Sequence, residues 1–388
     1  MDRLFLLDAY ALIYRSYYAF LKNPRINSKG LNTSAIMGFV NTLNEVITKE
    51  QPTYMAVAFD HGKTFRHEAY PPYKAQREET PEDIKLSVPY IKEILQAMHI
   101  PVLQADGFEA DDVIGTLATI AGQAGVETYM LTPDKDYGQL IAPNVFMFKP
   151  RHGGGYDIIG ESEIKEKYGI DSAHKVIDLL ALMGDSADNY PGCPGVGEKT
   201  AVKLINEFGS CEELLAHADQ LKGKMREKVE NAKEDIKMSK FLATIRTDVP
   251  IDLNLDELKM SEPDEKQLSE IFAQLEFKRL AEKFLHKAEN TKKSTPKQPS
   301  LFEEIPTNMP VAAENSILAS LKTTSHEYQL IDNKQDAARL YDFLRTKEIL
   351  SLDTETTSTN PIDAELVGLS FAVEENKAFY VAIPANRE

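Results

Sequence analysis

Acidic side chains follow several of the short apolar runs in this chain, at points where strands of a sheet would end. Asp8 comes directly after Leu4–Leu7, and Asp60 and Asp134 come at or just past the ends of two later runs. The strands of a parallel sheet end at one edge, and ligands bind in the crevice beyond their carboxyl ends. We therefore expect these carboxylates to lie close together in the fold.

Further carboxylates come in short clusters that could join the same edge. The complete set is Asp8, Asp60, Glu109, Asp111, Asp112, Asp134, Asp136, Asp185 and Asp188. So many anions repel one another unless cations lie between them. Mg²⁺ takes oxygen ligands and is bound by carboxylates together with substrate phosphates. The pattern predicts a metal site for phosphate chemistry.

Each cluster also has an ordinary structural interpretation. Acids favour the positive end of a helix, which could explain one or two of Glu109, Asp111 and Asp112. Pro and Asp are common in turns, so residues 132–136 taken alone favour a turn. Asp185 fits less well, because acids are unfavourable at a helix C-terminus.

The elements expected to position these side chains alternate between strands and helices. Such alternation is typical of an α/β domain with a mostly parallel sheet. The strands are expected over 3–8, 54–60, 102–103, 126–132 and 144–149, with helices over 35–49 and 111–124. After the glycines at 153–155 the pattern becomes helical, with helices expected over 174–184, 197–208, 211–217, 225–239 and within 265–286.

Bulk composition restricts the class of protein. With 388 residues, the chain is long enough for two to three domains. Its two cysteines make a disulfide framework improbable. Charges interrupt the apolar N-terminus, so neither a signal peptide nor a membrane span is expected, and a cytoplasmic location follows by default. The net charge of −17 argues against a nucleic-acid partner, but it does not describe local charge.

Residues 65–77 place aromatic and basic side chains side by side just past Asp60. Stacking on aromatic rings and neutralisation of the backbone are how single strands are bound without sequence preference. The alternative is a surface loop with buried tyrosines, and the sequence leaves both open.

The glycine-rich segment 191–200 resembles a phosphate-binding loop at first sight. The Walker pattern requires Gly-Lys where this chain has Gly197-Glu198, so a nucleotide hydrolase is not supported. A helix-hairpin-helix-like turn fits better, because its glycines let the backbone approach a phosphate. Lys199 and Lys203 would add charge without reading bases. A tight turn between two helices is the plainer alternative.

Taken together, these motifs resemble the N-terminal part of the bacterial DNA polymerase I family, whose first domain is a 5′ nuclease of the flap endonuclease family. The resemblance lies in residues 6–15, 59–60, 65–68, 73–74, 109–112, 134–136, 184–192 and 195–201. It implies a PIN-like α/β 5′ nuclease with a parallel sheet flanked by helices over 1–172. A helical DNA-binding subdomain of helix-hairpin-helix type is implied over 173–286, followed by a flexible linker over 287–325.

The resemblance also implies roles for individual residues. The nine acids would be the catalytic metal ligands and hold two Mg²⁺ or Mn²⁺ ions. Arg66, Lys74 and Arg77 would lie in or near an arch through which the 5′ strand passes. The remaining DNA contacts would be Arg15, Lys199, Lys203 and the turn at Gly192, Gly195 and Gly197, which in the family often holds a monovalent cation such as K⁺.

The last segment, 326–388, resembles the start of a 3′–5′ exonuclease domain of RNase H-like α/β fold. Asp353 and Glu355 match the first motif of that fold. Residues two apart in a strand lie on one face, so the two carboxylates can share a metal. An exposed strand with polar alternation is the alternative. The later exonuclease motifs and the polymerase domain are absent, so the chain is expected to be a fragment or shortened form that neither proofreads nor polymerises by itself.

Within the linker, Gln298-Pro299-Ser300-Leu301-Phe302 resembles the pentapeptide that docks on the bacterial sliding clamp. Patterns this short also match by chance.

The function expected from these observations is that of a metal-dependent 5′–3′ exonuclease and flap endonuclease. Its partners would be DNA with 5′ flaps, nicks or RNA primers, processed during repair and Okazaki primer removal. The alternative is a branched-DNA-binding module that keeps the fold but does no chemistry.

Overall fold

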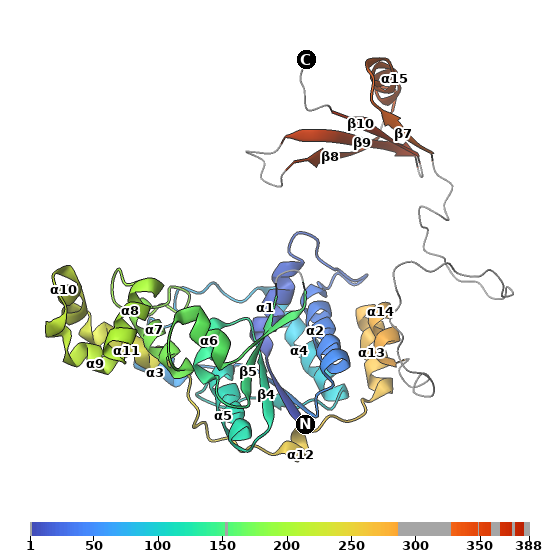
Figure 1. The fold of residues 1–388 in the computed structure, drawn as a ribbon. Coiled ribbons are helices and arrows are strands. Elements are labelled where there is room, and N and C mark those ends of the chain that lie inside the picture. The colour runs from blue at the N-terminus through green and yellow to red at the C-terminus, as the bar shows by residue number, and fades with distance from the viewer. Residues whose placement is uncertain are drawn as a thin grey trace. The chain divides into compact units, whose positions relative to one another are not determined.

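The computed structural model describes residues 2–151, 154–285, 327–347, 349–357, 365–374 and 377–383 (Figure 1). The chain forms two compact units, Met1–Thr295 and Pro296–Glu388, and each is described by itself. The predicted linker and the clamp-like pentapeptide at 298–302 lie outside the described residues.

The first unit contains a six-stranded sheet in the order β3-β2-β1-β4-β5-β6. Strand β1 pairs in parallel with both β2 and β4, and only β6 is antiparallel, to β5. The bounds are β1 Arg3–Asp8, β2 Tyr54–Ala58, β3 Val102–Leu103, β4 Glu127–Leu131, β5 Val145–Pro150 and β6 Tyr156–Ile159. The five predicted strands are therefore present. The sixth, β6, follows the glycine turn where the sequence pattern predicted only helices.

The sheet is buried on both faces, which explains the unbroken apolar runs of its central strands. In β1, Phe5 and Leu7 face one hydrophobic cluster, and Leu4 and Leu6 face the other. Helices α1 (Ala9–Ala19), α2 (Ser34–Glu50) and α4 (Glu82–Ala97) cover the first face. Helix α5 (Ala110–Gln123) covers the second. The short helices are α3 (Phe65–Ala69), α6 (Glu161–Tyr168) and α12 (Leu255–Leu258).

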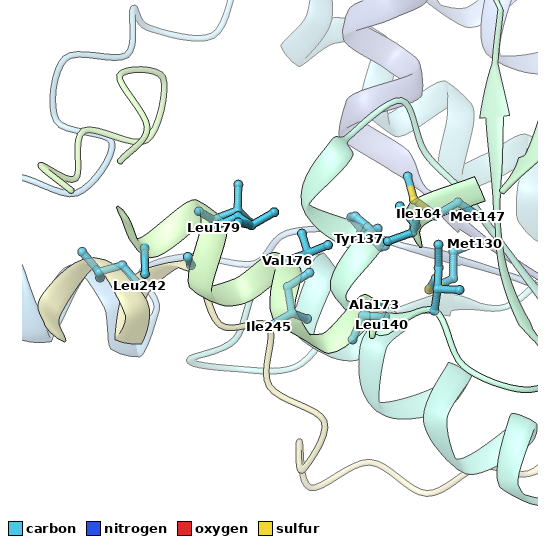
Figure 2. Close-up of a cluster of buried hydrophobic side chains, with 14 of the residues drawn as sticks. Met130, Tyr137, Leu140, Met147, Ile164, Ala173, Val176, Leu179, Leu242 and Ile245 are labelled. Atoms are coloured by element: carbon cyan, nitrogen blue, oxygen red, sulfur yellow. The ribbon is translucent and has the colours of Figure 1, made fainter. Parts of the chain in front are cut away.

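A group of helices extends from the second face of the sheet. Its members are α7 (Val176–Met183), α8 (Glu198–Phe208), α9 (Cys211–Ala216), α10 (Lys224–Asn231) and α11 (Lys233–Ala243). The single helix predicted over 225–239 is two helices, which meet at Ala232. Figure 2 shows that Val176, Leu179, Leu242 and Ile245 belong to the same buried cluster as Met130 and Met147 of the sheet. The helical group and the sheet therefore share one core.

The last two helices of this unit lie elsewhere than expected. The sequence assigned residues up to 286 to the helical subdomain, but α13 (Glu265–Leu275) and α14 (Lys278–Leu285) lie on the opposite side, next to α2 and α4 (Figure 1). Their apolar residues, such as Leu268 and Phe272, join the cluster that contains Phe5 and Leu7. The chain thus returns to the α/β layer after α11.

The second unit is a four-stranded sheet in the order β7-β10-β9-β8, with one helix. Its elements are β7 (Glu327–Ile331), α15 (Lys334–Leu344), β8 (Ser351–Thr356), β9 (Leu366–Glu374) and β10 (Lys377–Ala382). The residue pattern predicts a helix over 336–345 and strands over 350–355, 367–373 and 378–383, which correspond to α15, β8, β9 and β10, whereas β7 was not predicted. Across the described part of the chain, no helix has the length and apolar character that a membrane span requires.

Candidate active site

Asp8 begins the site at the centre of the sheet edge. It ends β1 and caps α1, with Oδ1 accepting the Ala11 N–H at 3.1 Å. Oδ2 accepts a 3.1 Å hydrogen bond from the Thr132 hydroxyl, just past the end of β4. Burial, together with repulsion from Asp60 and Asp134, raises the pKa of Asp8 to about 7. Strand-end carboxylates therefore come together at this edge.

The start of α5 brings further acids to Asp8. Asp60 accepts the Ala110 N–H at 2.8 Å, and partial dehydration and the Glu109 charge raise the pKa of Asp60. Burial and repulsion from Asp8, Asp134 and Glu109 raise the pKa of Asp111 well above its ordinary value. Because these groups influence one another, we call Asp8, Asp60, Glu109, Asp111 and Asp134 the inner cluster.

A second set of acids, Asp136 and Asp185, lies around Lys135. Nζ of Lys135 is 3.2 Å from Oδ1 of Asp136 and 2.9 Å from Oδ2 of Asp185. Burial and the Asp134 charge raise the pKa of Asp136 to about 7. Burial acts in the same direction on Asp185, but the hydrogen bond and charge of Lys135 outweigh it and lower the pKa of Asp185. Asp185 also accepts the N–H groups of Ala187 and Asp188, which gives it a role in the turn.

Basic groups, among them Lys74 and Arg77, border the acids on one side. Lys74 Nζ lies 2.8 Å from Glu109 and 3.9 Å from Asp188, and Arg77 pairs with Asp188. The Tyr73 hydroxyl oxygen lies 3.1 Å from Oε2 of Glu109 and 3.1 Å from Oδ2 of Asp188, so its single proton can be donated to either carboxylate. Asp188 is therefore connected to the site through the side chains of Lys74, Arg77 and Tyr73.

Two of the predicted site residues have a different role. Asp112 is fully buried, and its two oxygens accept four hydrogen bonds: two from Arg66 and one each from the backbone N–H groups of Glu109 and Arg246. Two carboxylate oxygens offer about four acceptor positions, so none is left for a metal. Arg66 is only 2% exposed and is not available to a DNA phosphate. This buried pairing corrects the prediction that Asp112 is a metal ligand and the prediction that Arg66 contacts DNA.

The predicted DNA-binding turn lies between α7 and α8. Gly192 has φ +62°, and a Cβ there would lie 2.3 Å from the backbone nitrogen of Gly184, so only glycine fits without a shift. Gly195 also has a positive φ, whereas Gly197 is extended and caps α8. Lys199 and Lys203 are exposed on α8.

Arg15, the remaining predicted DNA contact, is exposed on α1 and donates to the Arg151 carbonyl.

The donor set suits a hard divalent cation, since every group is a carboxylate oxygen. Oδ1 of Asp136 is buried, and its partner is the Lys135 ammonium 3.2 Å away, a position that a metal cation could take instead. The raised pKa values of Asp8, Asp111 and Asp136 record repulsion that a cation would relieve. Within the described ranges, however, no three Asp, Glu, His or Cys side chains are close enough to hold one ion together. The type of donor atoms fits a divalent metal, but the carboxylates of the described residues do not converge on a single position.

In the second unit, Asp353 and Glu355 lie two residues apart in β8. Both are exposed, and the alternation of the strand puts them on one face.

Several residues that hold the acids in place were not among the predicted site residues. Tyr73, Thr132, Lys135 and Tyr137 each contact a predicted acid directly. The signal that could have found most of them is position, because three of the four lie within or next to the motif at 132–136.

The fold and the site together define a PIN-like α/β nuclease with an attached helical domain. Two family profiles match in succession, "5′-3′ exonuclease, N-terminal resolvase-like domain" over residues 3–169 and "5′-3′ exonuclease, C-terminal SAM fold" over 172–266. The chain belongs to the 5′–3′ exonuclease family.

Individual relatives agree with this assignment. A 5′-3′ exonuclease of Aquifex aeolicus is 38% identical over 281 residues, which cover 72% of this chain and 94% of the relative. DNA polymerase I of Bacillus caldotenax is 40% identical over 285 residues, 72% of this chain but only 32% of the relative. The chain thus matches about a third of the length of that polymerase. These matches confirm the predicted resemblance and the predicted 5′–3′ exonuclease class.

A solved structure supports the fold. The flap endonuclease D15 of bacteriophage T5, in a complex with DNA and metal ions, aligns with a TM-score of 0.53 at 22% identity. The alignment covers 71% of this chain and the whole of the T5 protein.

Proposed function

We propose that residues 1–285 form a divalent-metal-dependent nuclease that hydrolyses DNA phosphodiester bonds at 5′ ends and 5′ flaps. The observation that carries the proposal is the inner cluster, in which carboxylates at or just past the ends of β1, β2 and β4 meet those at the start of α5. Burial and mutual repulsion raise the pKa of Asp8 there to about 7. A pure binding module gains nothing from such a cluster, because it repels phosphate. The T5 flap endonuclease, whose structure was solved with DNA and metal ions, supports the proposal of a metal-dependent nuclease by analogy of fold.

The metal ions we propose are two Mg²⁺ or Mn²⁺. The inner cluster would hold one, and Asp136, Asp185 and Asp188 would contribute to the other. When bound, such ions activate a water molecule and stabilise the leaving oxygen of the phosphodiester. Asp112 is excluded from the ligands because its oxygens are already occupied.

The side chains around the metal site bind and orient the DNA. Lys74 and Arg77 border the acids and would hold the phosphates next to the cleaved bond. Their carboxylate partners, Glu109 and Asp188, hold the Lys74 and Arg77 side chains at the site before DNA binds. On the helical side, Lys199, Lys203 and the turn from Gly192 to Gly197 would bind duplex backbone, with K⁺ on the turn carbonyls, and Arg15 would add a contact from α1.

A cleavage assay separates this proposal from the alternative of a non-catalytic branched-DNA binder. The substrate is a labelled 5′-flap DNA, with Mg²⁺ in one arm and EDTA in the other. Cleavage that requires Mg²⁺ and leaves a 5′ phosphate is the expected result. Binding of the flap DNA without any cleavage, across Mg²⁺ and Mn²⁺ concentrations, would favour the alternative.

Two substitutions test the assignment of the acids. Asp111→Ala and Asp134→Ala should each lower the cleavage rate by about 100-fold or more, roughly 2.7 kcal/mol of transition-state stabilisation. Duplex binding should change little, because neither carboxylate contacts the helical turn. Asp171→Ala, an exposed acid paired with Lys175, is the matched control. Wild-type rates in both test variants would show that the acids are assigned wrongly.

Other predictions extend this function. Residues 326–388 would be the start of a 3′–5′ exonuclease domain of RNase H-like fold, with Asp353 and Glu355 as its first metal-binding motif. Processing of nicks and RNA primers, docking on a sliding clamp through residues 298–302, and a cytoplasmic location also stay predictions. Both cysteines, Cys193 and Cys211, are free and buried, which is compatible with a reducing compartment.

A further inference from the structure

Arg66 is a buried arginine whose five N–H donors are all used. Nε donates to the Leu242 carbonyl at 2.9 Å, and Nη2 donates to the Thr244 carbonyl at 2.8 Å. Nη1 and Nη2 donate to the two oxygens of Asp112 at 2.7 and 2.8 Å. The fifth donor, on Nη1, points to Glu109 Oε2 at 3.4 Å. No donor remains for a ligand.

Asp112 completes the junction from the other side. Besides the bidentate pair with Arg66, it accepts the Glu109 N–H at 3.0 Å and the Arg246 N–H at 2.8 Å. One carboxylate therefore binds three segments: α3, the first turn of α5, and the chain that follows α11.

The junction links the ends of two helices through opposite charges. The carboxylate lies at the N-terminal end of α5, where negative charge is favourable, and the guanidinium binds carbonyls at the C-terminal end of α11, where positive charge is favourable. Helix ends carry backbone groups without intrahelical partners, so the pair also satisfies groups that would otherwise be unpaired. Figure 2 shows that Leu242 and Ile245, on either side of Thr244, lie in the buried core.

The acids of the inner cluster are adjacent to this junction in the chain. Glu109 is the N-cap of α5, and Asp111 directly precedes Asp112 in the first turn of that helix. The Glu109 backbone is bound to Asp112, and its side chain is within reach of Arg66. A shift of Asp112 would therefore move both neighbouring carboxylates.

We propose that the Arg66–Asp112 ion pair is a positioning device that holds Glu109 and Asp111 in place for metal binding and couples them to the end of α11. The pair itself touches neither metal nor DNA. The inference rests on the proposed function, because it assigns the pair to the site of that function. Partners that orient metal ligands typically change metal affinity or activity by about 10- to 100-fold when they are removed.

The test has to remove the pair without leaving one charge buried. Single substitutions such as Arg66→Met leave Asp112 without its counter-ion, and that loss alone destabilises a fold. The double variant Arg66→Met/Asp112→Leu removes both charges and fills the space with apolar groups. Replacing a buried ion pair in this way is often neutral for stability. Unfolding temperatures in EDTA establish that the variants compared are folded.

A second buried pair supplies the matched control. Lys240 Nζ lies 2.6 Å from Oδ1 of Asp178, which is 4% exposed and also accepts the Cys211 N–H. This pair joins α7, α9 and α11 and contacts none of the nine predicted acids. The control variant is therefore Lys240→Met/Asp178→Leu.

Mn²⁺ affinity of the free protein is measured by calorimetry without DNA, and kcat and KM are measured with 5′-flap DNA and Mg²⁺. For Arg66→Met/Asp112→Leu we expect Mn²⁺ affinity and kcat to fall about tenfold or more, with KM for DNA within about twofold of the unmodified protein. The control variant should keep the unmodified Mn²⁺ affinity. Unchanged Mn²⁺ affinity and kcat in the folded test variant, or an equal loss in the control, would overturn the proposal.

If the double variant does not fold, Arg66→Lys decides the question. Lysine keeps the positive charge but cannot span a carboxylate and two carbonyls with a planar fork. We expect Mn²⁺ affinity to fall about threefold to tenfold, and an unmodified affinity would overturn the proposal. Failure of the unmodified protein to cleave DNA would instead contradict the proposed function, and the comparison of Mn²⁺ affinities would still decide the positioning role.

Discussion

The hydroxyl of Tyr137 donates a 2.8 Å hydrogen bond to Oδ1 of Asp111. Tyr137 is fully buried in the 3₁₀ helix η1 (Lys135–Leu140), which begins directly after Asp134. One side chain thus connects the acid motif at 134–136 to the acid motif at 109–112. Burial and the neighbouring acids raise the pKa of Tyr137 well above its ordinary value, so the hydroxyl keeps its proton and acts as a donor.

Removal of this hydroxyl should weaken metal binding most at low pH. A hydrogen bond to a carboxylate favours its charged form, so Tyr137→Phe should raise the pKa of Asp111 further. Protons then compete better with the metal. We expect Mn²⁺ affinity at pH 6.5 to fall about fivefold, equivalent to roughly 1 kcal/mol for one hydrogen bond. Tyr168→Phe removes a hydroxyl that Lys167, not an acid, contacts, and it should leave the affinity unchanged. Equal affinities at pH 6.5 for Tyr137→Phe and the unmodified protein would contradict this assignment.

The metal-free protein should lose stability as the pH rises from about 4 to about 7. The pKa of Asp8 is raised from 3.8 to about 7 in the folded state, and the pKa of Asp136 is raised to about 7 as well. Between these values the folded state binds more protons than the unfolded chain, so the free energy of unfolding decreases with pH, by at most about 1.4 kcal/mol per pH unit for each group. Above about pH 7 the effect ends.

Urea unfolding in EDTA at pH 5, 6, 7 and 8 measures this dependence. Asp8→Asn cannot titrate at that position and should show a smaller slope. Mg²⁺ should oppose the loss at pH 8, because it binds the deprotonated carboxylates. A metal-free protein that becomes more stable from pH 5 to pH 7 would contradict the prediction.

The turn between α7 and α8 should depend on Gly192 far more than on Gly197. Gly192→Ala combines a positive φ with a Cβ 2.3 Å from the Gly184 nitrogen, so we expect a loss of about 2 kcal/mol or more in the free energy of unfolding. Gly197 has φ −97°, and a Cβ there meets no atom within 4 Å. Gly197→Ala replaces an N-cap glycine by a poorer capping residue and should therefore cost about 1 kcal/mol or less. Urea unfolding of the two variants, side by side, checks the difference, and equal losses would show that the turn is not so tight.

Lys199 and Lys203 should contribute to DNA binding through the backbone charge. The slope of log K against log salt is negative, and each phosphate contact that is lost makes it less steep by about 0.9 for duplex DNA. Lys199→Ala and Lys203→Ala should each show this change on duplexes of any sequence. Lys165→Ala is the control, because this partly exposed lysine of α6 is paired with Glu161. Salt titrations of duplex binding measure the slopes, and unchanged slopes in both test variants would remove α8 from the DNA interface.

The sequence alone determined most of the framework of this protein. Unbroken apolar runs predict strands buried on both faces, and acids after such runs predict carboxylates at one sheet edge. Asp8, Asp60 and Asp134 follow this rule because strand ends are local properties of the chain, and the alternation of strands with helices predicts that the strands are parallel. The strand β6 was not predicted, because four residues after a glycine turn carry little periodic signal. The helices α13 and α14 were predicted by their apolar spacing, but not the face of the sheet that they cover.

Only the tertiary structure decided which acids remain available and which are already paired. Asp112 and Asp111 are neighbours with the same chemistry, yet Asp112 is bound by Arg66 and two backbone N–H groups, while Asp111 turns toward Asp8 and Asp134. In the sequence, Arg66 belongs to the same basic segment as Lys74 and Arg77, but its partners Asp112 and Leu242 are 46 and 176 positions away. Pairings over such separations depend on how α3, α5 and α11 pack, and no local pattern of residues encodes that packing.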